Sequence, residues 1–414
     1  MKMRITCVSV SDQLGGSEIA LAGMVTALER LRPEWQFQVV LPGNGPLRDR
    51  LSETRAICSI VPMPEAVSSL GEWAAVQDGW RAGSQVALGI KLCGTAAALP
   101  RYESHLGRVI SEFRPNIVHT NGLKAHVLGA RLRTPDAGLV WHLHEYVSRR
   151  RLTRWLLRRY RSRCSAIVAN SASVAEDVVN SIRPGFVVQV VPNPVDLNLF
   201  SPNGASVDLD RLAGLPAASV NVTRVGLVAT YGRWKGHEVF LDALRQLASR
   251  SEIRGYIIGG PIYDTSNSQL TRGDLESMIE SRGLRGCVAL TGFLEPASAM
   301  RALDVVVHAS TEPEPFGLVI AEAMACGKPV VATGYGGAAE LVFDGKDALI
   351  AAAGDSAALV EAIAKLASDP RLRAAIGERA RETARLKFAP ETVASQLAGV
   401  FETAAVRSAV AQPA

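Results

Sequence analysis

The feature that most constrains the fold of this chain is a regular alternation of short apolar runs with longer segments of helical periodicity. Such alternation is typical of strand–helix units that wind a parallel sheet. The predicted strands of the first half are 4–10, 37–41, 57–61, 117–119, 139–144, 166–169 and 187–191. Those of the second half are 222–229, 253–259, 288–290, 305–308, 329–333 and 348–351.

A stretch rich in Pro, Gly, Asn and Asp separates the two series and shows neither periodicity. We therefore predict an α/β protein with two doubly wound, Rossmann-like domains, each large enough for its own core. Parallel sheets of this kind bind ligands at the carboxyl ends of their strands, so two facing domains would enclose a cleft. The expected parts are an N-terminal domain at 1–195, a linker at 196–220, a C-terminal domain at 221–388, and a helix with a frayed tail at 389–414.

Composition excludes several classes of protein. The 414 residues carry a net charge of only +5, and the eight arginines between 148 and 163 exceed that total, so a surface that coats nucleic acid is not expected. The six cysteines include no close pair, which argues against zinc knuckles and a disulfide framework and favours a reducing cytoplasm. Because no apolar run reaches about 18 residues, no membrane span is expected.

The most informative segment is STEPEPFGLVIAEAMACGKPVVAT, at 310–333. Phe316 and Gly317 open a predicted helix that Gly327 ends. The first amides of that helix, from Gly317 to Val319, would be free donors for a phosphate. Glu322 would lie one to two turns inside the helix, where it can accept hydrogen bonds from the hydroxyls of a ribose.

This segment resembles the C-terminal signature of retaining nucleotide-sugar glycosyltransferases of family 4, which have the two-domain GT-B fold. The resemblance implies that Glu314 contacts hydroxyls of the donor sugar and Glu322 the ribose, with Phe316, Gly317 and Leu318 near the diphosphate. It also implies a hexosyl-type transferase that uses a nucleotide-diphosphate sugar as co-substrate and needs no metal or other cofactor.

A second motif, TYGRWKGH at 230–237, follows the first strand of the second half. A lysine at a strand's carboxyl end can stabilise the charge that develops on a leaving diphosphate. Lys235 matches the family's Lys-Gly pair. The family's arginine usually stands several residues earlier, whereas Arg233 is only two residues from the lysine, so either Arg233 or another residue is the second cation.

Further pieces resemble family loops in the family's order. Gly15 and Gly16 match a glycine pair near the donor phosphate, and His144 matches a histidine that contacts the donor sugar or lines the acceptor site. Backbone groups of Gly292, Phe293 and Leu294 would meet the base. A D-x-D at 208–210, formally a metal motif, lies in the expected linker, where we predict that it is solvated.

The arginine-rich segment at 149–163 has Leu152, Trp155, Leu156 and Tyr160 at helical spacing. A basic amphipathic helix of this kind either lies on an anionic membrane surface or packs with a solvated cationic face. The first alternative favours a glycan or lipid-linked acceptor and a cytoplasmic enzyme that is peripheral to the inner face of the membrane. The expected pathway is the assembly of cell-envelope or exported glycans.

Two other functions remain open at this stage. A GT-B sugar-nucleotide epimerase would use the same donor without an acceptor, and a non-catalytic sensor would bind the donor without turnover. For the transferase, front-face attack and double displacement both remain possible, and no Asp or Glu in the matched motifs is an evident covalent nucleophile.

Overall fold

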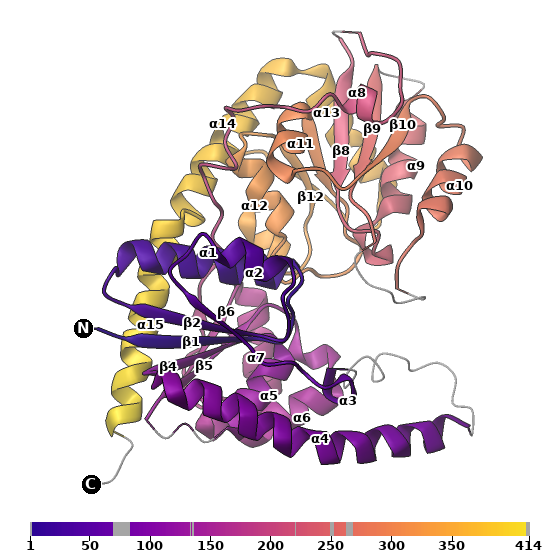
Figure 1. The fold of residues 1–414 in the computed structure, drawn as a ribbon. Helices are drawn as coiled ribbons and strands as arrows, with labels where there is room; N and C mark the ends of the chain where they lie inside the picture. Colours follow the sequence, from indigo (N-terminus) through magenta and orange to yellow (C-terminus); the bar gives the residue numbers. More distant parts are fainter. Residues whose placement is uncertain are drawn as a thin grey trace. The chain divides into compact units, whose positions relative to one another are not determined.

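The computed structural model describes residues 2–68, 83–132, 134, 136–219, 221–248, 252–261 and 268–410, with the backbone alone at 83–97 and 408–410. The chain forms two compact units (Figure 1). Unit 1 comprises Met1–Pro194 and Pro390–Ala414, and unit 2 comprises Val195–Ala389. Each expected apolar run overlaps a strand of the structure, so the sequence pattern located the strands of both units to within about two residues.

Unit 1 contains a parallel sheet in the order β3-β2-β1-β4-β5-β6-β7. Its five central strands are almost entirely buried, whereas the two edge strands, β3 and β7, are partly or fully exposed. The strands are β1 (Arg4–Ser9), β2 (Gln36–Leu41), β3 (Ile57–Ile60), β4 (Ile117–Asn121), β5 (Gly138–Leu143), β6 (Ala166–Ala169) and β7 (Gln189–Val190). The longer helices are α1 (Gly16–Leu31), α2 (Pro46–Leu51), α4 (Gly83–Phe113), α5 (Leu123–Arg131), α6 (Arg151–Tyr160), α7 (Ala172–Ile182) and α15 (Pro390–Val410); α3 (Glu65–Ser68) is a single turn.

The C-terminal helix α15 is part of unit 1. It packs against α1 and the sheet, and Phe401 and Ala404 are fully buried in that core. The tail that the sequence predicts to fray, from Ala404 onward, is helical as far as Val410, and Ala404 packs in the core. Residues 411–414 of the expected tail lie outside the described residues.

Unit 2 contains a parallel sheet in the order β10-β9-β8-β11-β12-β13. The strands are β8 (Thr223–Val228), β9 (Ile253–Ile258), β10 (Val288–Gly292), β11 (Val305–His308), β12 (Val330–Thr333) and β13 (Leu349–Ala351). The helices are α8 (Leu209–Leu212), α9 (His237–Leu247), α10 (Arg272–Ser281), α11 (Pro296–Ala302), α12 (Leu318–Ala325), α13 (Ser356–Ser368) and α14 (Pro370–Lys387). Short 3₁₀ turns include η4 (Arg233–Lys235) and η5 (Gly337–Leu341).

The segment 196–220, expected to be a linker, lies within unit 2. Phe200 and Leu209 join its core, and Asp210 is only 4% exposed. The prediction that the D-x-D is solvated is wrong for Asp210, which accepts hydrogen bonds from Arg224, Arg254 and Tyr256. Burial alone would raise the pKa of Asp210, but these donors hold the pKa below its usual range. Its carboxylate thus links α8 by hydrogen bonds to β8 and β9 of the sheet.

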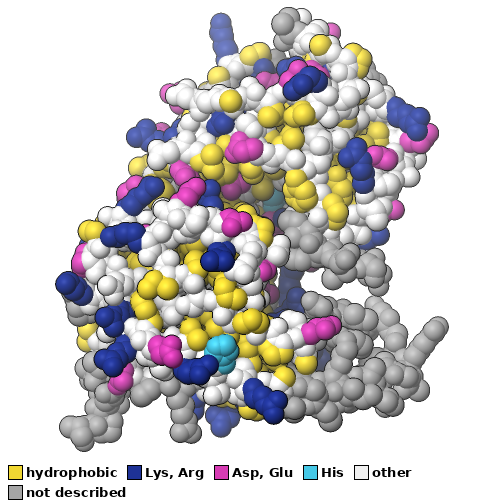
Figure 2. Space-filling view, in the orientation of Figure 1, with side chains coloured by type: hydrophobic (Ala, Val, Ile, Leu, Met, Phe, Trp, Pro, Cys, Tyr) yellow, Lys and Arg dark blue, Asp and Glu magenta, His cyan; other side chains and the backbone are white. Residues whose placement is uncertain are grey.

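The arginine-rich segment forms α6 as predicted, but its inward residue is Leu157. Leu152 and Trp155 are each 62% exposed, whereas Tyr160 packs against the core of unit 1, so only the first part of the expected apolar stripe faces outward. No helix in the described part of the chain is long and apolar enough to cross a membrane. On the face shown in Figure 2, basic and acidic side chains are interspersed over both units.

Candidate functional site

The predicted site residues of unit 2 gather where its sheet changes direction. Strand β8 lies between β9 and β11, so the chain leaves β8 toward one side and returns to β11 on the other. Ligands of doubly wound sheets bind at the carboxyl ends of such strands. Lys235 follows β8 and Glu314 follows β11, and Lys235 Nζ lies 2.6 Å from Glu314 Oε1. The structure thus joins two predicted catalytic residues that are 79 positions apart.

The surroundings of Glu314 favour its ionised form. The Ser310 hydroxyl donates to Glu314 Oε1, and His308 Nε2 lies 3.2 Å from the same oxygen. Burial alone would raise the pKa of Glu314, but the charges of Lys235 and His308 hold the pKa well below its usual range. His308 and Ser310 were not predicted as site residues, although they lie at the end of β11 and therefore at the same edge of the sheet.

Gly236 sets the position of Lys235. Its φ is +74°, and a Cβ there would lie 1.9 Å from the Ala309 carbonyl oxygen, so a side chain cannot be accommodated without movement. The backbone of Thr311 also donates to the Trp234 carbonyl at 2.8 Å. These two contacts hold the loop after β8 close to the loop after β11. The close approach explains why a glycine directly follows the lysine.

The N-terminus of α12 presents free donors, as the sequence predicts. The amides of Gly317, Leu318 and Val319 donate to no acceptor among the described residues. Gly317 has φ +86° and lies against Ala338 in the loop after β12. Three amides at a helix start favour an anion such as phosphate. The Phe316 side chain instead packs on Phe388 in the core, so only its backbone is placed near this helix start.

Glu322 is a buried carboxyl group without a partner. It is 7% exposed, and its side chain forms no hydrogen bond or ion pair with any residue that the structure describes. Burial, together with the charge of Glu295, raises its pKa to about 8. A buried acid without donors is costly, so its presence is best explained by a ligand that supplies them.

The remaining predicted residues of unit 2 lie around this edge. Gly292 ends β10 with φ +77°, and its carbonyl accepts the Gly259 amide. Phe293 is 61% exposed with its ring over Gly260, whereas Leu294 is half-buried against the core. Arg233 is exposed and forms no ion pair with a described residue, so the structure does not bring it to Glu314 as it brings Lys235.

In unit 1 the corresponding point lies between β1 and β4. Gly15 is the N-cap of α1 and Gly16 is its first residue, and Asn121 at the end of β4 donates to the Ser17 carbonyl at 3.2 Å. His144 follows β5 directly. Burial lowers its pKa to about 4, although the nearby Asn193 side chain acts in the opposite direction.

His144 is one end of a buried histidine cluster that the sequence did not predict. Its ring lies 4.2 Å from that of His142, and His142 Nδ1 lies 3.1 Å from His119 Nε2. His126 is bonded to Thr120 and stacks on Trp141. Burial lowers the pKa of each of these histidines, so the cluster is neutral at physiological pH.

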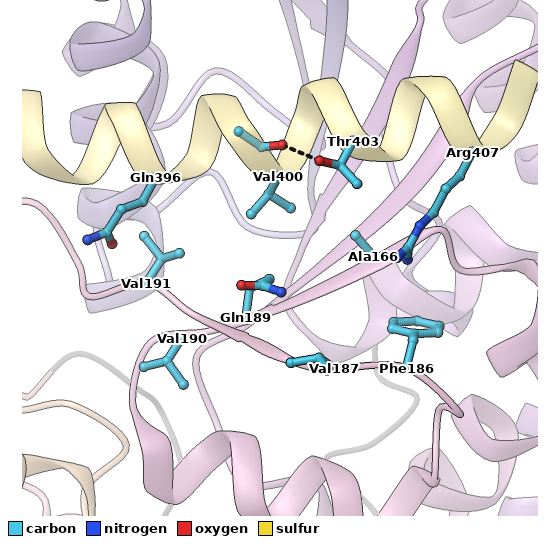
Figure 3. Close-up of a pocket in the computed structure, with 11 residues that line it drawn as sticks. Ala166, Phe186, Val187, Gln189, Val190, Val191, Gln396, Val400, Thr403 and Arg407 are labelled. Carbon is cyan, nitrogen blue, oxygen red and sulfur yellow. Dashed lines mark hydrogen bonds between the residues drawn. The ribbon is translucent and has the colours of Figure 1, made fainter.

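A separate hollow of about 570 Å³ lies in unit 1 beside the edge strand β7 and α15 (Figure 3). Its walls are Phe186, Val187 and Val190 on one side and residues of α15, including Val400 and Arg407, on the other. None of the predicted site residues lines it. Among the described residues, no group of three His, Cys, Asp or Glu side chains has the arrangement of a metal site.

Two family models match the chain, and they divide it much as the two units do. The model described as Glycosyltransferase Family 4 matches residues 15–199, and that described as Glycosyl transferases group 1 matches residues 220–383. The chain belongs to the family 4 glycosyltransferases. Its two Rossmann-like units are those of the GT-B fold, which its structural neighbours share.

Relatives of known name agree with this assignment. The D-inositol 3-phosphate glycosyltransferase of Xylanimonas cellulosilytica is 32% identical over 251 residues, which is 58% of each chain. This chain thus spans little more than half of that relative. The lipopolysaccharide core biosynthesis mannosyltransferase of Rhizobium leguminosarum bv. viciae is 28% identical over 77% of this chain and 89% of its own. Anabaena HepE, solved with UDP-glucose, is 26% identical and superposes with a TM-score of 0.76 over 97% of this chain and 100% of its own.

Proposed function

We propose that this family 4 glycosyltransferase moves a hexose from a nucleotide-diphosphate sugar to a hydroxyl acceptor, with retention of configuration and without a metal. The observation that carries the proposal is the meeting of three features at one edge of unit 2. These are the Lys235–Glu314 pair, the amides that begin α12, and the buried Glu322; neither these amides nor Glu322 has a partner in the part of the chain that the structure describes. Together they offer a cation, an anion site and an acceptor for ribose hydroxyls.

In the proposed reaction Lys235 and the α12 amides stabilise the departing diphosphate, where charge develops in the transition state. Arg233 contributes a second cation by turning from solvent toward the diphosphate. Glu314 accepts hydrogen bonds from the donor sugar, and His144 hydrogen-bonds the sugar or lines the acceptor site. The leaving oxygen takes the acceptor's proton as the acceptor attacks from the same face.

The donor is tested first by ligand-dependent thermal stability, because a ligand that binds only the folded state raises the melting temperature. We expect UDP, GDP or ADP to stabilise the full chain. We also expect the Glu322→Gln variant, which cannot become a carboxylate, to lose most of that shift. Since the Anabaena neighbour holds UDP-glucose, UDP is the first candidate. If none of the three nucleotides shifts the melting temperature, the donor class is wrong.

Turnover separates the transferase from its alternatives. Incubation with the matching donor and an acceptor should release the nucleoside diphosphate and yield an α-linked product from an α-linked donor, as NMR would show. A new sugar nucleotide from the donor alone would indicate an epimerase instead. An inverted product or a trapped glycosyl-enzyme would contradict front-face attack.

We also propose that the acceptor is a glycan or lipid-linked molecule met at an anionic surface through α6. The support is the outward face of that helix, where Leu152 and Trp155 are exposed among arginines. Arg151, Arg158 and Arg159 are exposed and form no ion pair with described residues. Each cationic residue near an anionic membrane contributes about 1 kcal/mol of attraction. This placement would put the enzyme on the inner face of the cell membrane, in the assembly of cell-envelope or exported glycans.

Sedimentation with vesicles of anionic phospholipid tests this surface. Replacing Arg151, Arg158 and Arg159 by Gln should weaken binding roughly a hundredfold at low salt, and raised salt should weaken wild-type binding likewise. The matched control replaces three exposed arginines of α14, namely Arg371, Arg379 and Arg385, with the same change of net charge. Equal losses in both variants would indicate that net charge, not α6, governs the binding.

A further inference from the structure

Three groups from two strands of unit 2 converge on Glu314 Oε1. They are Lys235 Nζ, the Ser310 hydroxyl and His308 Nε2, which is close enough for an ion pair but is not aligned as a hydrogen bond. His308 is the last residue of β11 and is buried. The strand end therefore fixes this ring beside the carboxylate, and no predicted function accounts for it.

The other ring nitrogen, Nδ1, has its own polar contact. His308 Nδ1 lies 3.3 Å from Thr333 Oγ1, which donates its hydroxyl proton to the Ser310 carbonyl oxygen at 3.0 Å. A hydroxyl has one proton to donate, so while Thr333 donates to the nearer Ser310 carbonyl it accepts from Nδ1, and this arrangement favours a hydrogen on Nδ1.

The Nε2 nitrogen, which faces Glu314, would then carry a second proton. A neutral ring protonated at Nδ1 would turn the lone pair of Nε2 toward an ionised carboxylate in a buried place, which is unfavourable. A proton on Nε2 makes this contact an ion pair. Among the described residues, the charged groups at this cluster are Glu314 and, across it, Lys235, while β12 contributes the uncharged Thr333.

We propose that His308 is held as an imidazolium that positions Glu314 and balances its charge, which frees Lys235 to move from the carboxylate to the diphosphate of the donor. This inference rests on the proposed function, because it assigns Lys235 two successive partners. Without donor, Lys235 and His308 share Glu314. With donor bound, His308 and Ser310 keep Glu314 ionised and oriented toward the sugar hydroxyls. His308 is thus a positioning residue, since it acts through Glu314.

Nitrogen-15 NMR of the full chain without donor tests the protonation state independently of activity. The two nitrogens of an imidazolium have nearly equal chemical shifts, whereas those of a neutral ring are far apart. The signal that disappears in His308→Gln identifies the residue. At pH 7.5 we expect the imidazolium pattern, and a neutral pattern would overturn the proposal even if the enzyme transfers sugar normally.

Kinetics of His308→Gln test the functional part. Glutamine keeps a donor toward Glu314 but removes the charge, so kcat/KM for the donor should fall by up to roughly 10²-fold, as for a misplaced catalytic group. The acid limb of its pH profile should move to higher pH, because a carboxylate that has lost one of its two cationic neighbours is protonated more easily. The exposed His105→Gln is the matched control and should behave as wild type.

Thr333 provides a second test that does not alter His308. Thr333→Val removes the oxygen that accepts from Nδ1 and should move the acid limb in the same direction, whereas Thr333→Ser should restore it. An unmoved acid limb in both Thr333→Val and His308→Gln would overturn the positioning role. If wild-type protein neither binds nor uses any nucleotide sugar, the proposed function fails, and the NMR result still decides the state of His308.

Discussion

The two units have the same kind of parallel sheet but opposite electrostatic states at the edge where a ligand is expected. In unit 2 the edge is charged, and Lys235 and Glu314 neutralise each other at 2.6 Å. In unit 1 the edge is occupied by buried, neutral histidines, several of whose nitrogens lack partners among the described residues. The comparison shows that the topology of the sheet determines where a site lies. The side chains at the strand ends determine which charge a ligand of that site can have.

The contrast fits a division of roles within the proposed function. A charged edge can exchange one ion pair for another when a diphosphate arrives, at little cost in solvation. A neutral, partly unsatisfied edge offers hydrogen-bonding groups to uncharged sugar hydroxyls instead. We therefore expect changes of pH and of side chains to act differently on the two units.

Acid should produce the largest difference. The pKa of His119 is lowered by burial to about 3 and that of His144 to about 4, and the pKa values of His126 and His142 are also lowered. As the pH falls, these histidines bind protons in the unfolded chain at a higher pH than in the folded chain. Protonation therefore does not reduce the free energy of unfolding above about pH 6.5, and it reduces this free energy progressively as the pH falls toward the pKa values of the folded state. Each fully buried histidine lowers the free energy of unfolding by up to about 1.4 kcal/mol for each pH unit below about 6.5.

Unit 2 should respond in the opposite sense over part of this range. The raised pKa of Glu322, about 8, stabilises unit 2 as the pH falls from 8 toward the ordinary value of a glutamate. In unit 1, Glu18 and Glu145 have pKa values raised by burial and offset part of the histidine effect. Hydrogen exchange at pH 7 and pH 5, corrected for intrinsic rates, should show β4 and β5 losing protection before β8 and β11. Loss of unit 2 first would contradict the comparison.

The next largest effect is expected for Lys235→Ala, which removes the cation from the charged edge. The transfer rate kcat should fall about 10²- to 10³-fold, as when one oxyanion-stabilising group is lost. The melting temperature should fall only modestly, because the Ser310 hydroxyl still donates to Glu314 and His308 still lies beside it. The control is Lys365→Ala, an exposed lysine of α13 in the same unit. Near-normal turnover of Lys235→Ala would rule out its assigned role.

Glycine substitutions give a third contrast. In Gly236→Ala the new Cβ would clash with the Ala309 carbonyl oxygen, and the alanine would have to adopt a positive φ. The free energy of unfolding should therefore fall by about 1–3 kcal/mol. A Cβ at Gly16 meets nothing within 4 Å, so Gly16→Ala should remain as stable as wild type. If the donor phosphate approaches Gly16, its KM should nevertheless rise. Denaturant unfolding and donor kinetics of both variants measure these effects, and equal stability of the two would show that the Ala309 contact is unimportant.

The smallest effect concerns proton release from Glu322 on nucleotide binding. Ribose hydroxyls donate to the carboxylate form, so affinity should rise by up to about tenfold per pH unit below pH 8 and level off above it. Calorimetry in two buffers of different ionisation enthalpy should detect the released proton at pH 7. Glu322→Gln should abolish both the pH dependence and the proton release. A pH-dependent affinity in that variant would assign the linkage to another group.

Local patterns predicted much of the fold. The runs at 166–169 and 305–308 coincide with β6 and β11, because a buried parallel strand is a continuous apolar run with clear ends. The predictions failed where long-range contacts override composition. Asp210 looks like a solvated linker residue until Arg224 and Arg254 are brought to it from neighbouring strands. Likewise, the alanines after residue 403 resemble a frayed tail, but Ala404 packs against the core of unit 1.

The sequence by itself determined where the strands lie, which residues begin α12, and that Lys235 and Glu314 each follow a strand. These are properties of short segments, whose periodicity and turn residues are set by neighbours along the chain. Only the tertiary structure decided that Glu314 meets Lys235, Ser310 and His308 at one oxygen, and that four histidines of unit 1 are neutral. The order of strands in each sheet brings these groups together, and burial then sets their charge, which no single segment encodes.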